Sequence, residues 1–161
     1  MMTNIFILIK LIFLLNVIII IFFLIIFVLY NFYKSNSRCI MKTIIVVEDN
    51  APIRKLFCTL LKKQGLEVID FGSGDAVLKE LPNLKPDLMV LDILLPDING
   101  TELIGKIRAM PHCSNVPAVA VTGFATEQDE IKFKELGFNG YLSKPINTDT
   151  FISEIKKHIT D

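Results

Sequence analysis

The sequence predicts an α/β fold, a doubly wound five-stranded parallel sheet with helices on both faces. From residue 42 onward, short apolar runs rich in β-branched residues alternate with segments of helical periodicity. Each run ends at polar or turn-forming residues, which is typical of strands buried on both faces. The alternation of strand and helix repeats five times, and such a repeat favours a parallel sheet.

The strands are predicted from the apolar runs, and the helices from apolar residues that recur at i, i+3 and i+4. We expect strands at residues 42–47, 66–71, 88–91, 116–121 and 141–143. The apolar stripe of the first helix consists of Ile53, Leu56, Phe57, Leu60 and Leu61. That helix should start at a cap, Asn50 or Asp49, and end at Gly65. Later helices are expected after Gly74 and after Gly100, and over 127–136 and 148–159.

Charge and composition divide the chain into two parts. Residues 1–41 contain three basic side chains and no acidic one, whereas residues 42–161 carry 14 basic and 17 acidic side chains. We therefore predict a domain at 41–161, large enough for its own core, preceded by a separate segment at 1–40. The mild acidity of the domain argues against a nucleic-acid surface. Its few, widely spaced cysteines indicate reduced thiols in a cytosolic domain.

Residues 11–30 form an almost wholly apolar segment, in which 18 of 20 residues are Leu, Ile, Phe or Val. Twenty helical residues span about 30 Å, the thickness of a bilayer core. The apolar side chains contribute about −5 to −11 kcal/mol to insertion. The segment thus predicts one transmembrane helix, and Lys34 and Arg38 after it would place the following domain in the cytoplasm.

A second interpretation of this segment stays open. Residues 1–40 consist largely of amino acids with AT-rich codons, and Met41 opens a natural start for the domain. A non-coding stretch wrongly joined to the chain would have the same composition. Both a membrane anchor and a mis-assigned start account for the segment.

The apolar run Leu88–Leu91 ends in an acid, Asp92, and a loop with Pro96 and Gly100 follows it. Asp92 is therefore expected at the carboxyl end of a buried strand, the edge at which open α/β sheets bind ligands. A partly desolvated carboxylate needs a partner. Asp92 either caps a turn or the next helix, or it belongs to a functional site.

Four of the predicted strands end in polar side chains. These are Glu48 and Asp49 after the first strand, Asp92 after the third, Thr122 after the fourth and Lys144 after the fifth. Right-handed crossovers bring the carboxyl ends of parallel strands to one edge of the sheet. We therefore expect these five side chains to lie close together.

The chemistry of this set indicates phosphoryl transfer. Three clustered carboxylates repel one another, and a hard divalent cation relieves that repulsion. Mg²⁺ prefers oxygen ligands and takes one or two carboxylates together with phosphate oxygens. Asp92 is a candidate nucleophile toward phosphorus, which would give an aspartyl phosphate. Lys144 and Thr122 are suited to bind the phosphoryl oxygens.

Four motifs closely resemble the response regulator receiver domain of two-component signalling. They are Glu48-Asp49-Asn50, Leu91-Asp92-Ile93-Leu94-Leu95-Pro96-Asp97-Ile98-Asn99-Gly100, Val121-Thr122-Gly123 and Tyr141-Leu142-Ser143-Lys144-Pro145. The resemblance covers the chain from Met41 onward, and Gly123 stands where the family often has alanine. It implies the flavodoxin-like strand order 2-1-3-4-5. It also implies that Asp92 is the phosphoacceptor, that Glu48 and Asp49 form the acid pair at Mg²⁺, and that the Leu94 carbonyl is a further ligand.

The same resemblance implies a switch. Thr122 would be the switch hydroxyl, Lys144 the phosphate-binding lysine and Tyr141 the aromatic switch, and the Lys144–Pro145 bond would be cis. A histidine kinase or histidine phosphotransfer protein would phosphorylate the domain. Phosphorylation would change the surface formed by residues 127–136, 141–143 and 148–159. With no output domain after that surface, signalling would run through a downstream effector or a phosphorelay, without enzymatic activity beyond the domain's own phosphorylation and dephosphorylation.

Two other functions compete with this hypothesis. An aspartate-nucleophile phosphatase would need a second acid two residues after the nucleophile, where this chain has Leu94. A membrane-tethered interaction module would bind its partners without phosphate and would owe its location to residues 11–30. The response regulator hypothesis accounts for more of the polar residues at the strand ends.

Overall fold

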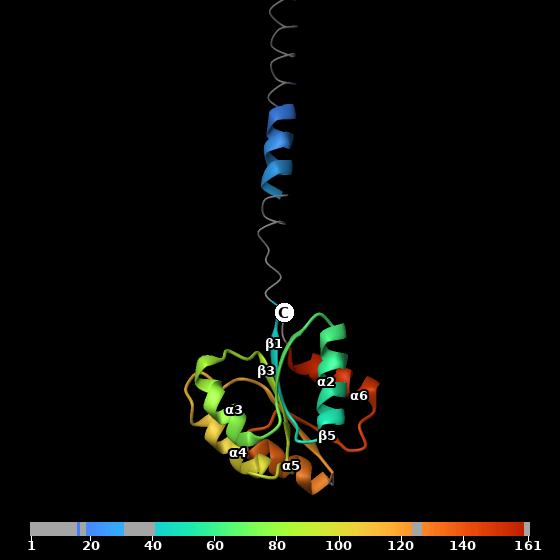
Figure 1. The fold of residues 1–161 in the computed structure, drawn as a ribbon. Helices are drawn as coiled ribbons and strands as arrows, with labels where there is room; N and C mark the ends of the chain where they lie inside the picture. The colour runs from blue at the N-terminus through green and yellow to red at the C-terminus, as the bar shows by residue number, and fades with distance from the viewer. Residues whose placement is uncertain (1–15, 17–18, 31–40, 124–126, 160–161) are drawn as a thin grey trace, which may run out of the picture. The chain divides into compact units, whose positions relative to one another are not determined.

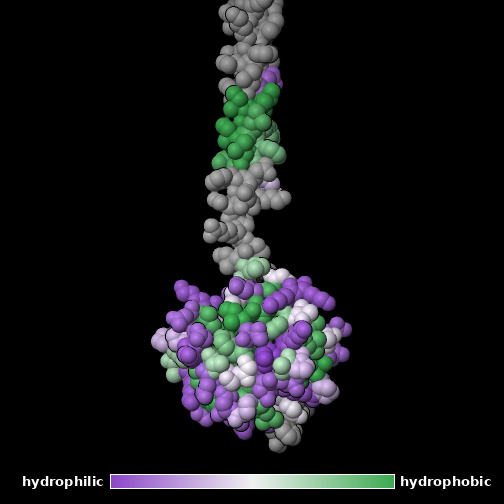
Figure 2. All heavy atoms as spheres, in the orientation of Figure 1, coloured by the Kyte–Doolittle hydropathy of each residue, from purple (hydrophilic) through white to green (hydrophobic). Residues whose placement is uncertain are grey.

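The computed structural model describes Asn16 and residues 19–30, 41–123 and 127–159 (Figure 1). The chain divides into two units, residues 1–40 and residues 41–161. In the first unit, residues 19–30 are helical, and Figure 2 shows them as a continuous apolar surface. No helix in the described part of the chain is long and apolar enough to cross a membrane. Residues 11–15, 17 and 18 of the predicted anchor lie outside the described residues, so that anchor stays a prediction.

The second unit contains the predicted five-stranded parallel sheet. Its strands are β1 (Thr43–Val47), β2 (Glu67–Phe71), β3 (Leu88–Asp92), β4 (Ala118–Thr122) and β5 (Gly140–Ser143). They pair in the order β2-β1-β3-β4-β5, and every pair is parallel. The strand order implied by the family resemblance is therefore confirmed. Each strand was predicted within two residues of its bounds in the structure.

Helices cover both faces of the sheet (Figure 1). They are α2 (Ala51–Lys63), α3 (Gly74–Glu80), α4 (Gly100–Arg108), α5 (Glu127–Glu135) and α6 (Thr148–His158), and a short 3₁₀ turn η1 (Leu81–Asn83) follows α3. Helices α2 and α6 lie on one face of the sheet, and α3, α4 and α5 lie on the other. This arrangement confirms the doubly wound fold.

Alternate strand residues point to opposite faces, so the sheet separates two apolar cores. Toward α3, α4 and α5 the strands contribute Ile45, Val47, Met89, Leu91, Ala118 and Ala120. Toward α2 and α6 they contribute Ile44, Val46, Leu88, Val90, Val119, Val121 and Leu142. Nearly all of these side chains are fully buried. The central strands are therefore held from both sides, and their carboxyl ends are fixed in position.

The second core includes the contact between α2 and α6. Phe57 stacks on Phe151 with ring centroids 4.6 Å apart and an interplanar angle of 11°. Leu56, which the sequence placed on the apolar stripe, is instead 42% exposed. The stripe of α2 is narrower than predicted, because Phe57 and Leu61 already fill the space above the sheet.

Helix α2 begins directly after the polar end of β1, and its cap settles an alternative that the sequence left open. The side chain of Asn50, not that of Asp49, accepts a hydrogen bond from the Ile53 amide at 3.2 Å. Asp49 is therefore free of any capping role. At the other end, Gly65 adopts the positive φ of 78° that the predicted helix end requires.

Candidate functional site

Four strand ends bring their polar side chains to one edge of the sheet. Glu48 and Asp49 follow β1, Asp92 ends β3, Thr122 ends β4 and Lys144 follows β5. Strands β1 and β3 are neighbours, with Val47 paired to Leu91, so the residues after them lie side by side. The predicted convergence of these residues is thus what the structure shows.

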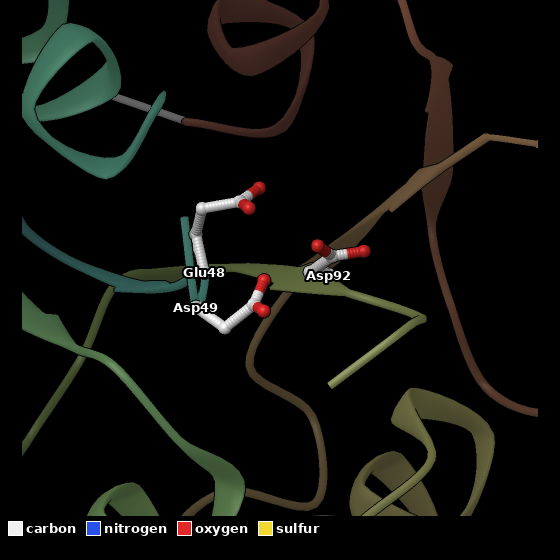
Figure 3. Close-up of side chains that lie close together, drawn as sticks. All are labelled: Glu48, Asp49 and Asp92. Atoms are coloured by element: carbon white, nitrogen blue, oxygen red, sulfur yellow. The ribbon is translucent and has the colours of Figure 1, made fainter. Parts of the chain in front are cut away.

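The three carboxylates form one acidic cluster. Oxygens of Glu48, Asp49 and Asp92 all lie within 4.8 Å of one another, and Figure 3 shows the three side chains around a common space. Glu48 is 1% exposed and Asp92 is 2% exposed, whereas Asp49 lies open to solvent. Two of the acids are therefore desolvated, and the third is accessible from solvent.

Lys144 supplies the cation that partners the buried acids. Its Nζ lies 2.7 Å from Asp92 Oδ2 and 2.9 Å from Glu48 Oε2. Nζ also donates a longer hydrogen bond, 3.3 Å, to Glu48 Oε1. Glu48 Oε2 is buried and accepts no hydrogen bond in spite of its closeness to Nζ. This oxygen thus retains a lone pair for another ligand.

Burial is the largest single influence on the pKa of Glu48 and on that of Lys144. It raises the pKa of Glu48 above its ordinary value of 4.5; the nearby charge of Asp92 adds to that rise, and Lys144 opposes it. For Lys144, burial by itself favours the neutral amine, but hydrogen bonds to Asp92 and Glu48 together raise its pKa. The ammonium form of Lys144 is therefore retained beside the two acids.

The loop after β3 holds Asp92 from the other side. Asp92 Oδ1 accepts a hydrogen bond from the Leu94 amide at 3.0 Å, whereas the cap of α4 is the side chain of Asn99. Asp92 thus bonds to its own turn, as one interpretation of the sequence had it, and also faces the acidic cluster. It does not cap the next helix. The Leu94 side chain is 55% exposed beside the site.

Gly100 permits the tight passage from β3 into α4. A Cβ at this position would lie 2.5 Å from the carbonyl oxygen of Asp92 and 2.7 Å from the Cα of Ile93. The Gly100 amide donates to the Ile93 carbonyl at 2.9 Å. The sequence marked Gly100 as a turn residue, but its contact with the backbone of Asp92 could be seen only in the fold.

The residues of the predicted switch lie on β4 and β5. Thr122 is 2% exposed, and its carbonyl accepts a hydrogen bond from the Lys144 amide at 2.7 Å. Tyr141 is half-buried, with its ring centroid 6.5 Å from that of Phe133 in α5. The Lys144–Pro145 peptide bond is cis, as the family resemblance implied.

Two further residues support the site, and the sequence did not single them out for this. Asp97, in the loop after Asp92, accepts hydrogen bonds from the amides of Gly74 and Asp75, at 3.2 and 2.7 Å, and so ties that loop to the start of α3. Arg54 in α2 donates to the carbonyls of Glu48 and Asp49. Asp97 joins the loop after β3 to α3, and Arg54 joins α2 to the loop after β1. The spacing of apolar residues in the sequence does not predict contacts of this kind.

The donor set fits a hard divalent cation. Carboxylate oxygens of Glu48, Asp49 and Asp92 converge within 4.8 Å of one another. Carboxylates and carbonyls are the ligands that Mg²⁺ takes, usually with several waters retained. Among the residues that the structure describes, no thiol or imidazole takes part in this cluster, which disfavours zinc or copper there.

Comparison with known proteins supports the family resemblance described for the sequence, and the match lies within the second unit. The model of the response regulator receiver domain family matches residues 44–156. The polar-differentiation response regulator DivK of Brucella ovis is 36% identical over 120 residues, covering 74% of this chain and 98% of that protein.

Solved structures agree with the sequence comparison. The receiver domain protein of Methanospirillum hungatei superposes with a TM-score of 0.68 at 28% identity, over 74% of this chain and 94% of that one. The chemotaxis response regulator CheY4 of Vibrio cholerae, at 23% identity, has the same fold with a TM-score of 0.70 over 73% of this chain and 98% of its own. With its sheet order, its acidic edge and these matches together, the chain belongs to the response regulator receiver domain family.

Proposed function

We propose that this protein is a phosphorylation-controlled signalling protein and that Asp92 is its phosphoacceptor. The observation that carries the proposal is the environment of Asp92. Its carboxylate is buried at the carboxyl end of the central strand, within 4.8 Å of two other acids and 2.7 Å from Lys144 Nζ. A carboxylate held in such a place, with a cation beside it, is suited to nucleophilic attack.

In the proposed reaction a carboxylate oxygen of Asp92 attacks the phosphorus of a phosphohistidine. The new O–P bond forms an acyl phosphate, the P–N bond breaks, and the leaving imidazole takes up a proton. Lys144 then pairs with a phosphoryl oxygen instead of with Asp92. A bound Mg²⁺, held by Glu48, Asp49, Asp92 and the Leu94 carbonyl, would neutralise charge on the phosphoryl oxygens.

The phosphoryl group would act on the rest of the domain through Thr122 and Lys144. The Thr122 hydroxyl would move toward a phosphoryl oxygen, and Tyr141 on the neighbouring strand would turn inward in response. These shifts would change the surface of α5, β5 and α6, and with it the affinity for a downstream effector. A ligand shifts two states only by its differential affinity, which these two contacts would provide.

The partners follow from this chemistry. The phosphoryl donor would be a histidine kinase or a histidine phosphotransfer protein, and the receiver domain would work in the cytoplasm. We propose no enzymatic activity beyond formation and hydrolysis of its own aspartyl phosphate.

The uncovered apolar helix at 19–30 favours one addition to this function. Its side chains, from Ile19 to Tyr30, are all 45–66% exposed, and apolar surface of this kind is stable only against lipid or protein. We propose that residues 11–30 tether the receiver domain to a membrane. The intact mass of the native protein and its partition after an alkaline wash test this. A soluble protein whose mass begins at Met41 would reject the tether.

Beryllofluoride, a phosphoryl analogue, tests the main proposal. With Mg²⁺ it should shift the amide resonances near Thr122 and Tyr141 in the wild type and leave Asp92→Asn unchanged. Asp75→Asn, which alters an exposed acid at the start of α3, is the control and should respond as the wild type does. Equal responses of the wild type and Asp92→Asn would refute Asp92 as phosphoacceptor.

A further inference from the structure

Arg54 binds the backbone that carries the acid pair. Its Nη1 donates to the carbonyl of Glu48 at 2.6 Å and to the carbonyl of Asp49 at 3.2 Å. Its Nε donates to Asp70 Oδ2 on β2 at 3.1 Å. The guanidinium thus joins three segments: the loop after β1, the first turn of α2 and the end of β2.

The position of this guanidinium is closely determined. Asp70 binds Nε of the guanidinium, and the two loop carbonyls bind Nη1. A Cβ at Gly72 would lie 3.3 Å from Arg54 Nη1, so the glycine leaves the space that the guanidinium occupies. The Arg54 side chain is only 22% exposed. A planar fork with several donors suits such bridging, whereas a lysine offers one point of attachment.

The carboxylate of Asp49 depends on this contact more than the other two acids do. Glu48 and Asp92 pair with Lys144, but the Asp49 side chain has no hydrogen bond or ion pair within the described ranges. Only the backbone of Asp49 is fixed, and Arg54 is the side chain that binds the carbonyl of that backbone. Without this contact, the solvent-exposed ligand would have to be ordered by the metal itself.

We propose that Arg54 is a positioning residue that sets the affinity of the acidic cluster for its divalent cation. This inference rests on the proposed function, because it takes the cluster to be a metal site. By fixing the carbonyls of Glu48 and Asp49, Arg54 orders both ligands before the ion binds. Residues that orient metal ligands typically contribute 10–100-fold to affinity, and we expect about tenfold here because one of the two ligands is also held by Lys144.

The charge of Arg54 and its contacts to the loop should affect metal affinity in opposite directions. Its positive charge repels a cation, so removing the charge alone would tighten metal binding. Loss of the contacts to the carbonyls would instead weaken binding, because the loop must then be ordered by the ion. Lys55, the next residue in α2, is exposed and carries the same charge without a contact to the loop. It offers a matched control for the effect of charge.

The experiment measures the binding of Mn²⁺ to the full chain from the signal of the free ion in electron paramagnetic resonance, with Mg²⁺ as competitor. Arg54→Met should raise the dissociation constant about tenfold. Lys55→Met should leave it within about twofold, because an exposed charge is screened by salt. Arg54→Lys keeps the charge but cannot bind Asp70 and the two loop carbonyls at the same time, so its dissociation constant should fall between those of Arg54→Met and the wild type.

The stability of the metal-free protein separates positioning from a purely structural role. Arg54→Lys should retain the wild-type urea midpoint without metal and still bind Mn²⁺ more weakly than the wild type. If Arg54→Met does not fold, weaker metal binding by Arg54→Lys carries the inference. Unchanged or tighter binding by the Arg54 variants would overturn it. A wild type that binds neither Mn²⁺ nor Mg²⁺ would instead refute the metal site of the proposed function.

Discussion

Lys144 balances two buried carboxylates, and it therefore contributes to stability in addition to the phosphate-binding role proposed for it. Its ammonium lies within 3 Å of an oxygen of Asp92 and of an oxygen of Glu48. Removing one partner of a buried pair leaves an uncompensated charge, which is costly. The site therefore holds its own counter-ion, which in the proposed reaction would pair with the phosphoryl group instead of with Asp92.

Lys144→Met tests this balance. Breaking a fully buried pair costs about 3–5 kcal/mol, and because Lys144 is a quarter exposed we expect a loss of about 2 kcal/mol in the free energy of unfolding. Urea denaturation without metal measures the loss. Lys134→Met removes a lysine from an exposed pair with Glu130 and should cost less than about 0.5 kcal/mol. Equal losses for the two variants would contradict this account of Lys144.

Glu48 gives a dependence of stability on pH. Burial raises its pKa in the folded protein above 4.5. Between 4.5 and the raised value, the folded protein holds a proton that the unfolded chain has released. Stability therefore falls as the pH rises through this window, and the loss is complete above the raised pKa. Glu48→Gln has no proton to lose there.

Urea denaturation of the wild type and Glu48→Gln across this window measures the effect. The wild type should lose stability relative to Glu48→Gln as the pH rises, by about 1.4 kcal/mol for each unit by which the pKa is raised. If the free energy of unfolding depends on pH in the same way for both proteins, folding does not raise the pKa of Glu48.

Helix α4 contains two glycines that meet different surroundings. Gly100 lies against the backbone of Asp92 and Ile93, whereas a Cβ at Gly105 would meet no atom within 4 Å. Gly100→Ala forces the start of α4 away from β3 and should destabilise the domain by about 1–3 kcal/mol. Gly105→Ala should stabilise it by about 0.5–1 kcal/mol, because alanine restricts the unfolded chain.

Thermal unfolding of the two variants measures this contrast. Because Gly100 lies against the backbone of Asp92, the proposed phosphoacceptor, Gly100→Ala should also weaken Mg²⁺ binding, and Gly105→Ala should not. Similar melting temperatures for the two variants would contradict this contrast, because they would show that α4 can shift away from β3 without loss of stability.

Periodicity predicted most elements well, because the strands and helices α2, α4 and α6 carry their own apolar patterns, whereas α5 is largely polar and is marked mainly by Gly137 after its end. Periodicity wrongly placed Leu56 on the buried side of α2. The spacing of apolar residues shows which side of a helix faces the core, but not how much of that side the neighbouring elements cover. It also missed the roles of Arg54 and Asp97. Their partners are backbone groups that the fold brings near, and a backbone carbonyl or amide leaves no mark in a sequence.

On the scale of the whole molecule, both apolar cores lie within residues 41–161. We therefore expect this unit to fold without residues 1–40. The fragment 41–161 and the full chain should show the same urea midpoint by circular dichroism, after the signal of the first unit is subtracted. A fragment with a lower midpoint would show that the first unit stabilises the second.

The convergence of strand ends was predictable at this scale, because right-handed crossovers leave few places for the ends of parallel strands. The distances within the site were not. The separation of Asp92 from Lys144 depends on the pairing of β3, β4 and β5 and on which way each long side chain turns.

The counter-ion of the buried acids follows the last of the five strands. On the ribosome, Glu48, Asp49 and Asp92 are made well before Lys144, and a nascent chain that paired β1 with β3 would bury two carboxylates without their ammonium. Burying these carboxylates costs free energy until β5 pairs with β4 and brings Lys144 beside them. The acidic edge is therefore expected to form late in folding. The acidic edge of the sheet is therefore complete only when the last strand and the lysine after it are in place.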